Sequence, residues 1–409
     1  MQRPFTTISR TRRAADGRPG HTLTLQRLGL ARRRPDAPVK RLRWAVVAVV
    51  VLAASACGRD GSSSEEPSGA VTTVSGRPAV SVTAPAGEHE TPTTTAPRET
   101  SEADGEAFPV TVEHRYGTTT IESRPLRIVT VGLTDQDALL ALGVVPVGTT
   151  EWFGGHPGAV WPWAQDELGD GPTPEIVGTA AEINFEKVAA LDPDLILAVY
   201  SGVTESEYRT LSAIAPTVAQ PADVVDYGVS WEDQTLTIGR TVGLATEAEE
   251  LVADLLGRFA DARDAHPAFE GTEGLVATPY EGSVFVYAPE DARGRFMDAL
   301  GFVDVAEITA LAGDGFGSEI SYERLDLVDV DALVWIVDDI ETDVATFRDE
   351  PLYARLDVSH EGRDVFVENL SELGGATSFV SVLSLPTLLD SLVPMLAAAV
   401  DGDPATPVR

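Results

Sequence analysis

The chain has 409 residues, of which 43 % are hydrophobic, so it is long enough to fill the cores of two domains of ordinary size. Its formal net charge is −34, and this acidity argues against nucleic acid as a partner, because phosphates require a basic surface. The single cysteine, Cys57, excludes an internal disulfide framework and a cysteine-ligated zinc or iron–sulfur centre.

The N-terminal region has the opposite charge balance from the rest of the chain. Residues 1–57 carry twelve Arg and Lys against two Asp and Glu, and residues 44–56 hold no charge. This apolar run is shorter than the roughly 20 residues of a spanning helix and ends in small residues, so 1–57 is predicted to be a signal peptide. Residues 58–107 are rich in Ser, Thr, Pro, Gly and Glu. They are predicted to form a flexible tether, because this composition buries too little apolar surface to fold.

The end of the predicted signal peptide carries a short motif. Ala54-Ser55-Ala56-Cys57 resembles a bacterial lipobox, in which the cysteine is lipidated and becomes the first residue of the mature protein. The sequence departs from the motif at Ala54, where Leu is usual. The resemblance implies an exported protein held by Cys57 on the outer face of the cytoplasmic membrane. Ordinary signal cleavage and an uncleaved anchor are the alternatives.

From residue 108 onward, short β-rich runs alternate with helical stretches, which predicts an α/β architecture. Most of these runs consist of Val, Ile and Leu, as in mainly parallel sheets covered on both faces. Strands are predicted at 127–131, 145–149, 195–200, 275–280, 283–287, 332–337 and 365–368. Helices are predicted at 135–142, 185–191, 205–213, 231–242, 246–266 and 380–400.

An internal repeat relates two parts of this body. Residues 182–199 align without gaps to residues 319–336, and each copy predicts an N-capped helix followed by a turn and a buried strand. Asn184 and Ser321 are the predicted caps. The repeat predicts two lobes with the same local plan. Their boundaries, and that of the C-terminal tail, are placed at 108–229, 272–402 and 403–409.

Residues 230–271 are predicted to connect the two lobes. Within them, 246–266 form one uninterrupted amphipathic stretch closed by Pro267. At 1.5 Å per residue this helix would span about 30 Å, the width of a lobe. The sequence therefore predicts two lobes joined by one long rigid helix, with a ligand cleft between them.

The sequence shows no catalytic machinery. It contains no P-loop, no G-x-S-x-G elbow and no H-E-x-x-H motif, and its histidines after the tether are scattered. We therefore predict no enzyme activity, no cofactor and no metal held directly by protein side chains. Open α/β sheets bind ligands near the carboxyl ends of strands, where this chain places aromatic and arginine residues. The candidate ligand contacts are Trp152, Tyr200, Tyr287, Arg293, Arg295, Phe316 and Phe379.

Ordered matches over nearly the whole body carry a family resemblance. Phe108-Pro-Val-Thr-Val-Glu-His114, Leu191-Asp-Pro-Asp-Leu-Ile196 and Phe379-Val-Ser-Val-Leu-Ser-Leu-Pro386 are among them. With these segments the chain resembles the iron-siderophore solute-binding proteins of ABC importers, whose relatives bind haem and cobalamin. The resemblance implies a pre-chelated ferric siderophore as ligand and a membrane permease as partner. Some hydroxamate binders have an arginine where this chain has 179–181, so the siderophore class stays open.

The resemblance also gives the internal repeat a role. Members of this family present one glutamate from each lobe to arginines of the permease, and the corresponding residues are Glu186 and Glu323. A carboxylate at the start of a helix is also favoured by the helix macrodipole without any partner.

Three other functions remain as alternatives. The ligand could be haem or a corrinoid, with Tyr200 or Tyr287 as an axial haem ligand. A lipid-anchored hydrolase is less favoured, because no nucleophile motif with a base-orienting partner is visible. An adhesion or signalling ectodomain would bind no chelate at all.

Overall fold

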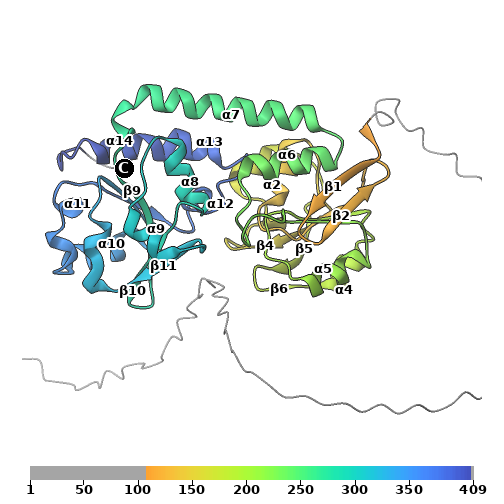
Figure 1. Ribbon diagram of the computed structural model, residues 1–409, viewed down its shortest axis with the longest axis horizontal. Helices are drawn as coiled ribbons and strands as arrows, with labels where there is room; N and C mark the ends of the chain where they lie inside the picture. The colour runs from red at the N-terminus through yellow and green to blue at the C-terminus, as the bar shows by residue number, and fades with distance from the viewer. Residues whose placement is uncertain (1–106, 407–409) are drawn as a thin grey trace, which may run out of the picture. The chain divides into compact units, whose positions relative to one another are not determined.

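Two β-sheets organise the part of the chain that the computed structural model describes, residues 107–406 (Figure 1). The predicted signal peptide, Cys57 and the predicted tether up to residue 106 lie outside these residues. A short antiparallel hairpin, β1 (Val110–His114) and β2 (Gly117–Ile121), precedes the first sheet. None of the described helices is long and apolar enough to cross a bilayer.

The first sheet has six strands in the order β6-β5-β4-β3-β7-β8, and all neighbours are parallel except β6, which runs antiparallel to β5. Its central strands are buried because helices cover them, as the Val, Ile and Leu runs predict. The strands are β3 (Ile128–Thr130), β4 (Gly148–Glu151), β5 (Glu175–Thr179), β6 (Glu182–Ile183), β7 (Leu195–Ala198) and β8 (Thr217–Ala219). The helices between them are α2 (Asp135–Ala141), α3 (Gln165–Leu168), α4 (Phe185–Ala190) and α5 (Glu205–Ser212).

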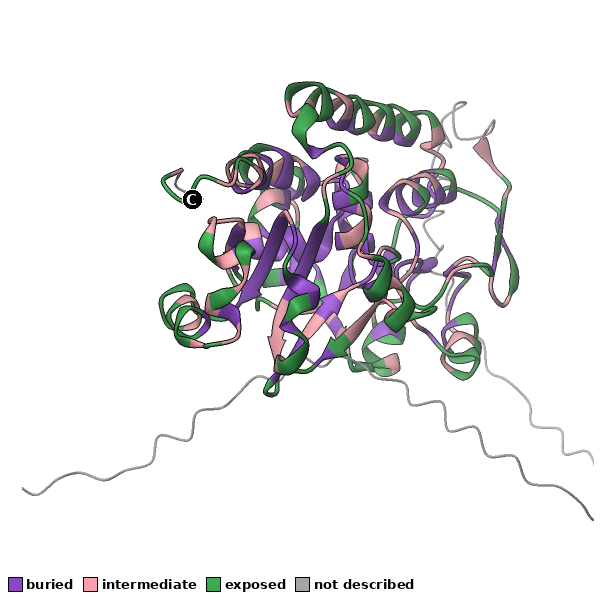
Figure 2. Cartoon of the chain, turned by 60° about the vertical axis from the view of Figure 1, so that its left-hand side comes forward, coloured by how far each residue is buried: buried purple, intermediate pink, exposed green. Residues whose placement is uncertain are grey.

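The second sheet has five strands in the order β11-β10-β9-β12-β13. Strands β9, β12 and β13 are parallel, whereas β10 and β11 are added antiparallel at one edge. Every residue of β12 is buried, and Figure 2 shows the centre of this sheet in purple. The strands are β9 (Gly274–Tyr280), β10 (Ser283–Tyr287), β11 (Gly317–Ile320), β12 (Ala332–Val337) and β13 (Asp364–Glu368). The helices are α8 (Ala292–Ala299), α9 (Ala306–Ala312), α10 (Ile340–Asp349), α11 (Asp357–His360), α12 (Glu372–Phe379), α13 (Leu385–Thr387) and α14 (Val393–Val400), with a π-helical turn at Leu388–Leu392.

Helix α7 (Ala245–Ala265) matches the predicted strut to within one residue. It packs against α6 (Trp231–Thr241). It also contacts the 3-10 turn Pro267–Phe269 and the π-helical turn before α14. Its buried residues form one stripe, Ala248, Val252, Leu255 and Phe259, while the outward face is exposed (Figures 1 and 2). The α/β fold class, with parallel-rich sheets and one long connecting helix, is confirmed.

Two local predictions are wrong. The helix expected at 380–400 does not begin at Val380, because α12 ends at Phe379 and Val380 adopts a left-handed conformation with φ +44°. The chain becomes helical again only at Leu385. In the second copy of the repeat, Tyr322–Val328 is a 3-10 turn whose Ser321 makes no side-chain cap, whereas Asn184 accepts the Lys187 amide at 3.0 Å as predicted.

Candidate functional site

Tyr200 follows the carboxyl end of β7, and a buried carboxylate fixes its backbone. Asp135, at the start of α2, accepts hydrogen bonds from the amides of Val199 at 2.8 Å and Tyr200 at 2.9 Å, and from Gln234 Nε2 at 2.7 Å. Burial raises the pKa of Asp135, and these three donors oppose the shift. The Asp135 carboxylate of α2 thus connects this helix to the end of β7 and to α6, next to the backbone of Tyr200.

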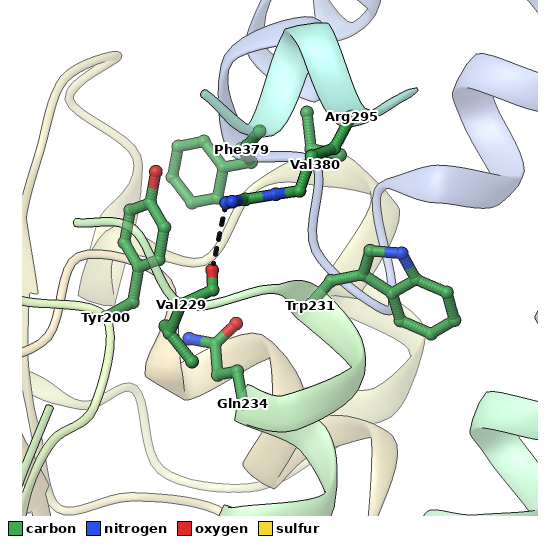
Figure 3. Close-up of a pocket in the computed structure, with 8 residues that line it drawn as sticks. Tyr200, Val229, Trp231, Gln234, Arg295, Phe379 and Val380 are labelled. Atoms are coloured by element: carbon green, nitrogen blue, oxygen red, sulfur yellow. Dashed lines mark hydrogen bonds between the residues drawn. The ribbon is translucent and has the colours of Figure 1, made fainter. Parts of the chain in front are cut away.

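A small cavity lies where the two sheets' elements meet (Figure 3). Arg295 of α8 reaches across it and donates to the carbonyls of Gly228 at 3.1 Å and Val229 at 3.3 Å. The cavity volume of about 10 Å³ is room for one water-sized molecule. We call the part of the fold built around the first sheet the first half and the part built around the second sheet the second half. The cavity lining comes from both halves: Tyr200, Val229, Trp231, Gln234, Ala292, Arg295, Phe379 and Val380.

A second arginine, which is buried, lies beside this cavity. Arg293 is 7 % exposed, pairs with Asp291 at 2.8 Å and lies 4.0 Å above the centre of the Tyr287 ring. Burial is the largest single effect and lowers the pKa of Arg293, but Asp291, Tyr287 and Tyr200 together outweigh it and raise the pKa, so the guanidinium stays charged. Burial likewise raises the pKa of Tyr200 and of Tyr287, so both phenols remain protonated donors at neutral pH.

Phe379 is enclosed by aromatic rings of the first half of the fold. It is 2 % exposed. Its ring centroid lies 5.3 Å from Trp152, 5.8 Å from Phe153, 5.7 Å from Trp161 and 5.3 Å from Trp163. We call these four residues the aromatic socket. Trp152 also contacts Tyr200, at 6.5 Å between centroids, so the socket adjoins the cavity.

The structure brings only some of the predicted ligand contacts together. Tyr200, Arg295 and Phe379 line the cavity. Trp152 contacts the rings of Tyr200 and Phe379, and Arg293, which lies over the Tyr287 ring, is an electrostatic neighbour of Tyr200. Phe316 lies apart on the second sheet, where its ring packs 5.6 Å from Phe285.

Sequence reasoning missed part of the cavity wall. Trp231 and Gln234 lie at the start of α6, a segment interpreted only as a connection between lobes, and Val229 lies just before it, at the predicted end of the first lobe. The segment Trp231-Glu-Asp-Gln234 also resembles the iron-siderophore binding proteins, and this was the signal that could have identified Trp231 and Gln234.

The two predicted docking glutamates are exposed on separate halves of the fold. Glu186 lies in the first turn of α4 and Glu323 in the 3-10 turn that begins at Tyr322. A hydrogen bond from the Ser321 hydroxyl lowers the pKa of Glu323, so its carboxylate is ionised at neutral pH.

The described residues contain no group of three or more His, Cys, Asp or Glu side chains that could hold a metal ion. What the site offers instead is aromatic surface, protonated phenols and guanidinium groups. Such groups suit a bulky organic ligand with oxygen acceptors.

Comparison with known proteins defines the class. The family model for periplasmic binding proteins matches residues 128–363, more than half of the chain, and the chain therefore belongs to this family. A solved structure of a periplasmic solute-binding protein from Mycobacterium smegmatis str. MC2 155 is 36 % identical. It has a TM-score of 0.64 and covers 71 % of this chain and 98 % of its own.

Several curated relatives have names that refer to binding a siderophore or a ferric chelate. The chain is 31 % identical to the probable siderophore-binding lipoprotein YfiY of Bacillus subtilis (strain 168) over 47 % of this chain, and it spans only 56 % of that relative's length. It is 29 % identical to the Fe(3+) dicitrate-binding periplasmic protein FecB of Escherichia coli (strain K12), over 61 % of this chain and 76 % of FecB. The predicted resemblance to iron-siderophore binding proteins is confirmed.

Proposed function

We propose that the chain is the extracytoplasmic substrate-binding component of an ABC importer, which captures a ferric siderophore and delivers it to a membrane permease. The observation that carries this proposal is the convergence of Tyr200, Arg295 and Phe379 on one cavity between the two halves of a periplasmic-binding-protein fold. Aromatic faces can stack on the organic part of a chelate, and guanidinium and phenol groups can donate to its oxygens.

Ligand capture requires a local change at this cavity. A volume of about 10 Å³ is far below the roughly 300–1,000 Å³ of ordinary ligand pockets. Arg295 is the side chain best placed to change, because its two hydrogen bonds to backbone carbonyls are long, 3.1 and 3.3 Å. A guanidinium has five N–H donors, so Arg295 can exchange these bonds for bonds to chelate oxygens.

Tryptophan fluorescence tests the proposal directly, because Trp152, Trp161, Trp163 and Trp231 surround the cavity or its socket. The full chain carrying Cys57→Ser would be titrated with a ferric hydroxamate, a ferric catecholate, ferric citrate and haemin. Saturable quenching at sub-micromolar concentration by one ferric chelate supports the proposal and identifies the ligand class. Quenching by haemin alone would replace it with haem uptake, and no response to any of the four would refute it.

Arg295→Ala gives this titration a residue-level test. We expect at least a tenfold loss of affinity, since the variant removes a charged donor from the cavity wall. Arg258→Ala is the matched control, because Arg258 is an exposed arginine of α7 that pairs with Asp390 away from the cavity. If Arg295→Ala and Arg258→Ala bind the chelate with equal affinity, Arg295 does not belong to the ligand site.

We further propose that Glu186 and Glu323 dock onto the permease and that Cys57 is lipidated, so that the tether lets the anchored body reach its partner. The exposure of both carboxylates on separate halves of the fold supports docking. Glu186→Gln and Glu323→Gln should abolish uptake while leaving chelate binding unchanged. Glu247→Gln is the control, because Glu247 is exposed in the first turn of α7. Uptake retained in the Glu186 and Glu323 variants would disprove docking through these residues.

A further inference from the structure

Residues 375–383 span the end of α12 and the chain that follows it, and they contact the first half of the fold. Helix α12, in which this segment begins, packs on α8 and β13 of the second half. Leu383, in contrast, packs against a hydrophobic cluster of the first half that includes Leu140 and Val160. The Ser381 hydroxyl donates a hydrogen bond to Asp137 Oδ2 on α2. The segment is therefore a further point, besides α7 and Arg295, at which the two halves are joined.

The fit of this segment is close. Phe379 fills the aromatic socket, and a Cβ added at Gly375 would lie 2.3 Å from the Trp161 ring, so only glycine allows this approach. Asp137 accepts a hydrogen bond from Trp163 Nε1 at 2.9 Å as well as the one from Ser381. One fully buried carboxylate thus joins a wall of the socket to the segment that the socket holds.

The backbone between these anchors is strained. Val380 has φ +44° and ψ +46°, a left-handed conformation that is strongly disfavoured for a β-branched residue. Its neighbours Phe379 and Ser381 are both fixed in the first half of the fold, and this accounts for the retention of the strain. Val380 and Phe379 are also part of the cavity wall.

We propose that Asp137 is a positioning residue for the ligand site. By holding Ser381 and Trp163 it seats residues 375–383 in the first half of the fold. The segment then fixes both the cavity wall formed by Phe379 and Val380 and the placement of the two halves relative to each other. The effect on ligand affinity rests on the proposed function, whereas the effect on placement does not.

Distance measurements between the two halves test the proposal. Spin labels would be attached to the full chain carrying Cys57→Ser at Ala189→Cys on α4 and Ala345→Cys on α10, both exposed. The pulsed electron–electron distance distribution would be recorded for Asp137→Ala, for Ser381→Ala and for the conservative Asp137→Asn. The matched control is Asp364→Asn, because Asp364 is also buried and accepts from Tyr353 and Arg348, all within the second half. Chelate affinity would be measured in parallel.

We expect Asp137→Ala and Ser381→Ala to broaden the distance distribution, and Asp137→Ala to weaken chelate binding at least tenfold. Asp137→Asn, which keeps an oxygen acceptor, should restore both properties, and Asp364→Asn should change neither. Unchanged distributions in both Asp137→Ala and Ser381→Ala, or equal broadening in Asp364→Asn, would overturn the proposal. If no chelate binds the wild type, the proposed ligand fails while the distance distributions still decide whether this tie exists.

Discussion

The buried carboxylate of Asp137 should make the stability of the protein depend on pH in an unusual direction. Burial raises the pKa of Asp137 from 3.8 to about 6, although the hydrogen bonds from Ser381 and Trp163 oppose the shift. The folded state therefore binds this proton more tightly than the unfolded state does. Protonated Asp137 therefore stabilises the folded state. This stabilisation is fully present below about pH 4 and is lost as the pH rises to about 6.

The magnitude follows from the size of the shift. Roughly two pKa units at 1.36 kcal/mol each correspond to about 3 kcal/mol of unfolding free energy between pH 4 and pH 7. Asp137→Asn removes this titration while its amide oxygen can still accept from Ser381 and Trp163. Asp137 Oδ1 has no hydrogen-bond partner among the described residues, so an amide nitrogen placed there costs about 1–3 kcal/mol at every pH.

The assay is denaturant unfolding of wild type and Asp137→Asn at pH 4, 5, 6 and 7. The wild type should lose about 3 kcal/mol relative to the variant across this range. The comparison cancels the many other carboxylates that both proteins share. Ser381→Ala removes a hydrogen bond that lowers the pKa of Asp137. In this variant the loss of stability should therefore extend to higher pH. A stability difference between wild type and Asp137→Asn that stays constant from pH 4 to pH 7 would refute the reasoning.

Two further substitutions test buried hydrogen bonds, one beside the first sheet and one beside the second. Gly132→Ala would place a Cβ 2.1 Å from Asp135 Oδ2 and displace that carboxylate from the amides it holds, so unfolding should require about 1–3 kcal/mol less. Tyr353→Phe removes a hydroxyl that accepts from Trp335 Nε1 at 2.9 Å and donates to Asp364 at 2.6 Å. It should cost a similar amount, measured by the shift of the denaturant midpoint, and an unchanged midpoint in either variant would contradict its mechanism.

Where the sequence predicted the fold well, a local signal and the tertiary structure agreed. The β-rich run 283–287 and the continuous apolar run 332–337 became β10 and β12 with the predicted bounds. The predicted strut succeeded because its apolar stripe has the helical period and Pro267 marks its end. Strand β8 at Thr217–Ala219 was missed because three residues carry too little periodicity to detect, whereas β3, equally short, was predicted as part of the longer run 127–131.

The candidate site was harder to predict, because its side chains depend on contacts distant in sequence. Tyr200, Arg295 and Phe379 were singled out by residue type and position near strand ends or loops, and the structure brings them together at one cavity, while their contact with a ligand stays a prediction. The break after Phe379 was missed, because Val380 is neither Gly nor Pro and continues an apolar helical pattern. Its left-handed conformation is imposed by anchors that the local sequence does not show.

The two acidic residues of α2 illustrate what such anchors do. In the sequence Thr134-Asp135-Gln136-Asp137 reads as the polar first turn of a helix, where carboxylates are normally exposed. In the structure both aspartates are fully buried, and each makes side-chain hydrogen bonds to a different distant segment. Asp135 fixes Tyr200 on one wall of the cavity, and Asp137 fixes the segment that carries Phe379 on the other. One short helix therefore sets the separation of two cavity walls whose residues lie 179 positions apart in the chain. Because both carboxylates are desolvated, the cost of burying them is offset only while both walls are in place.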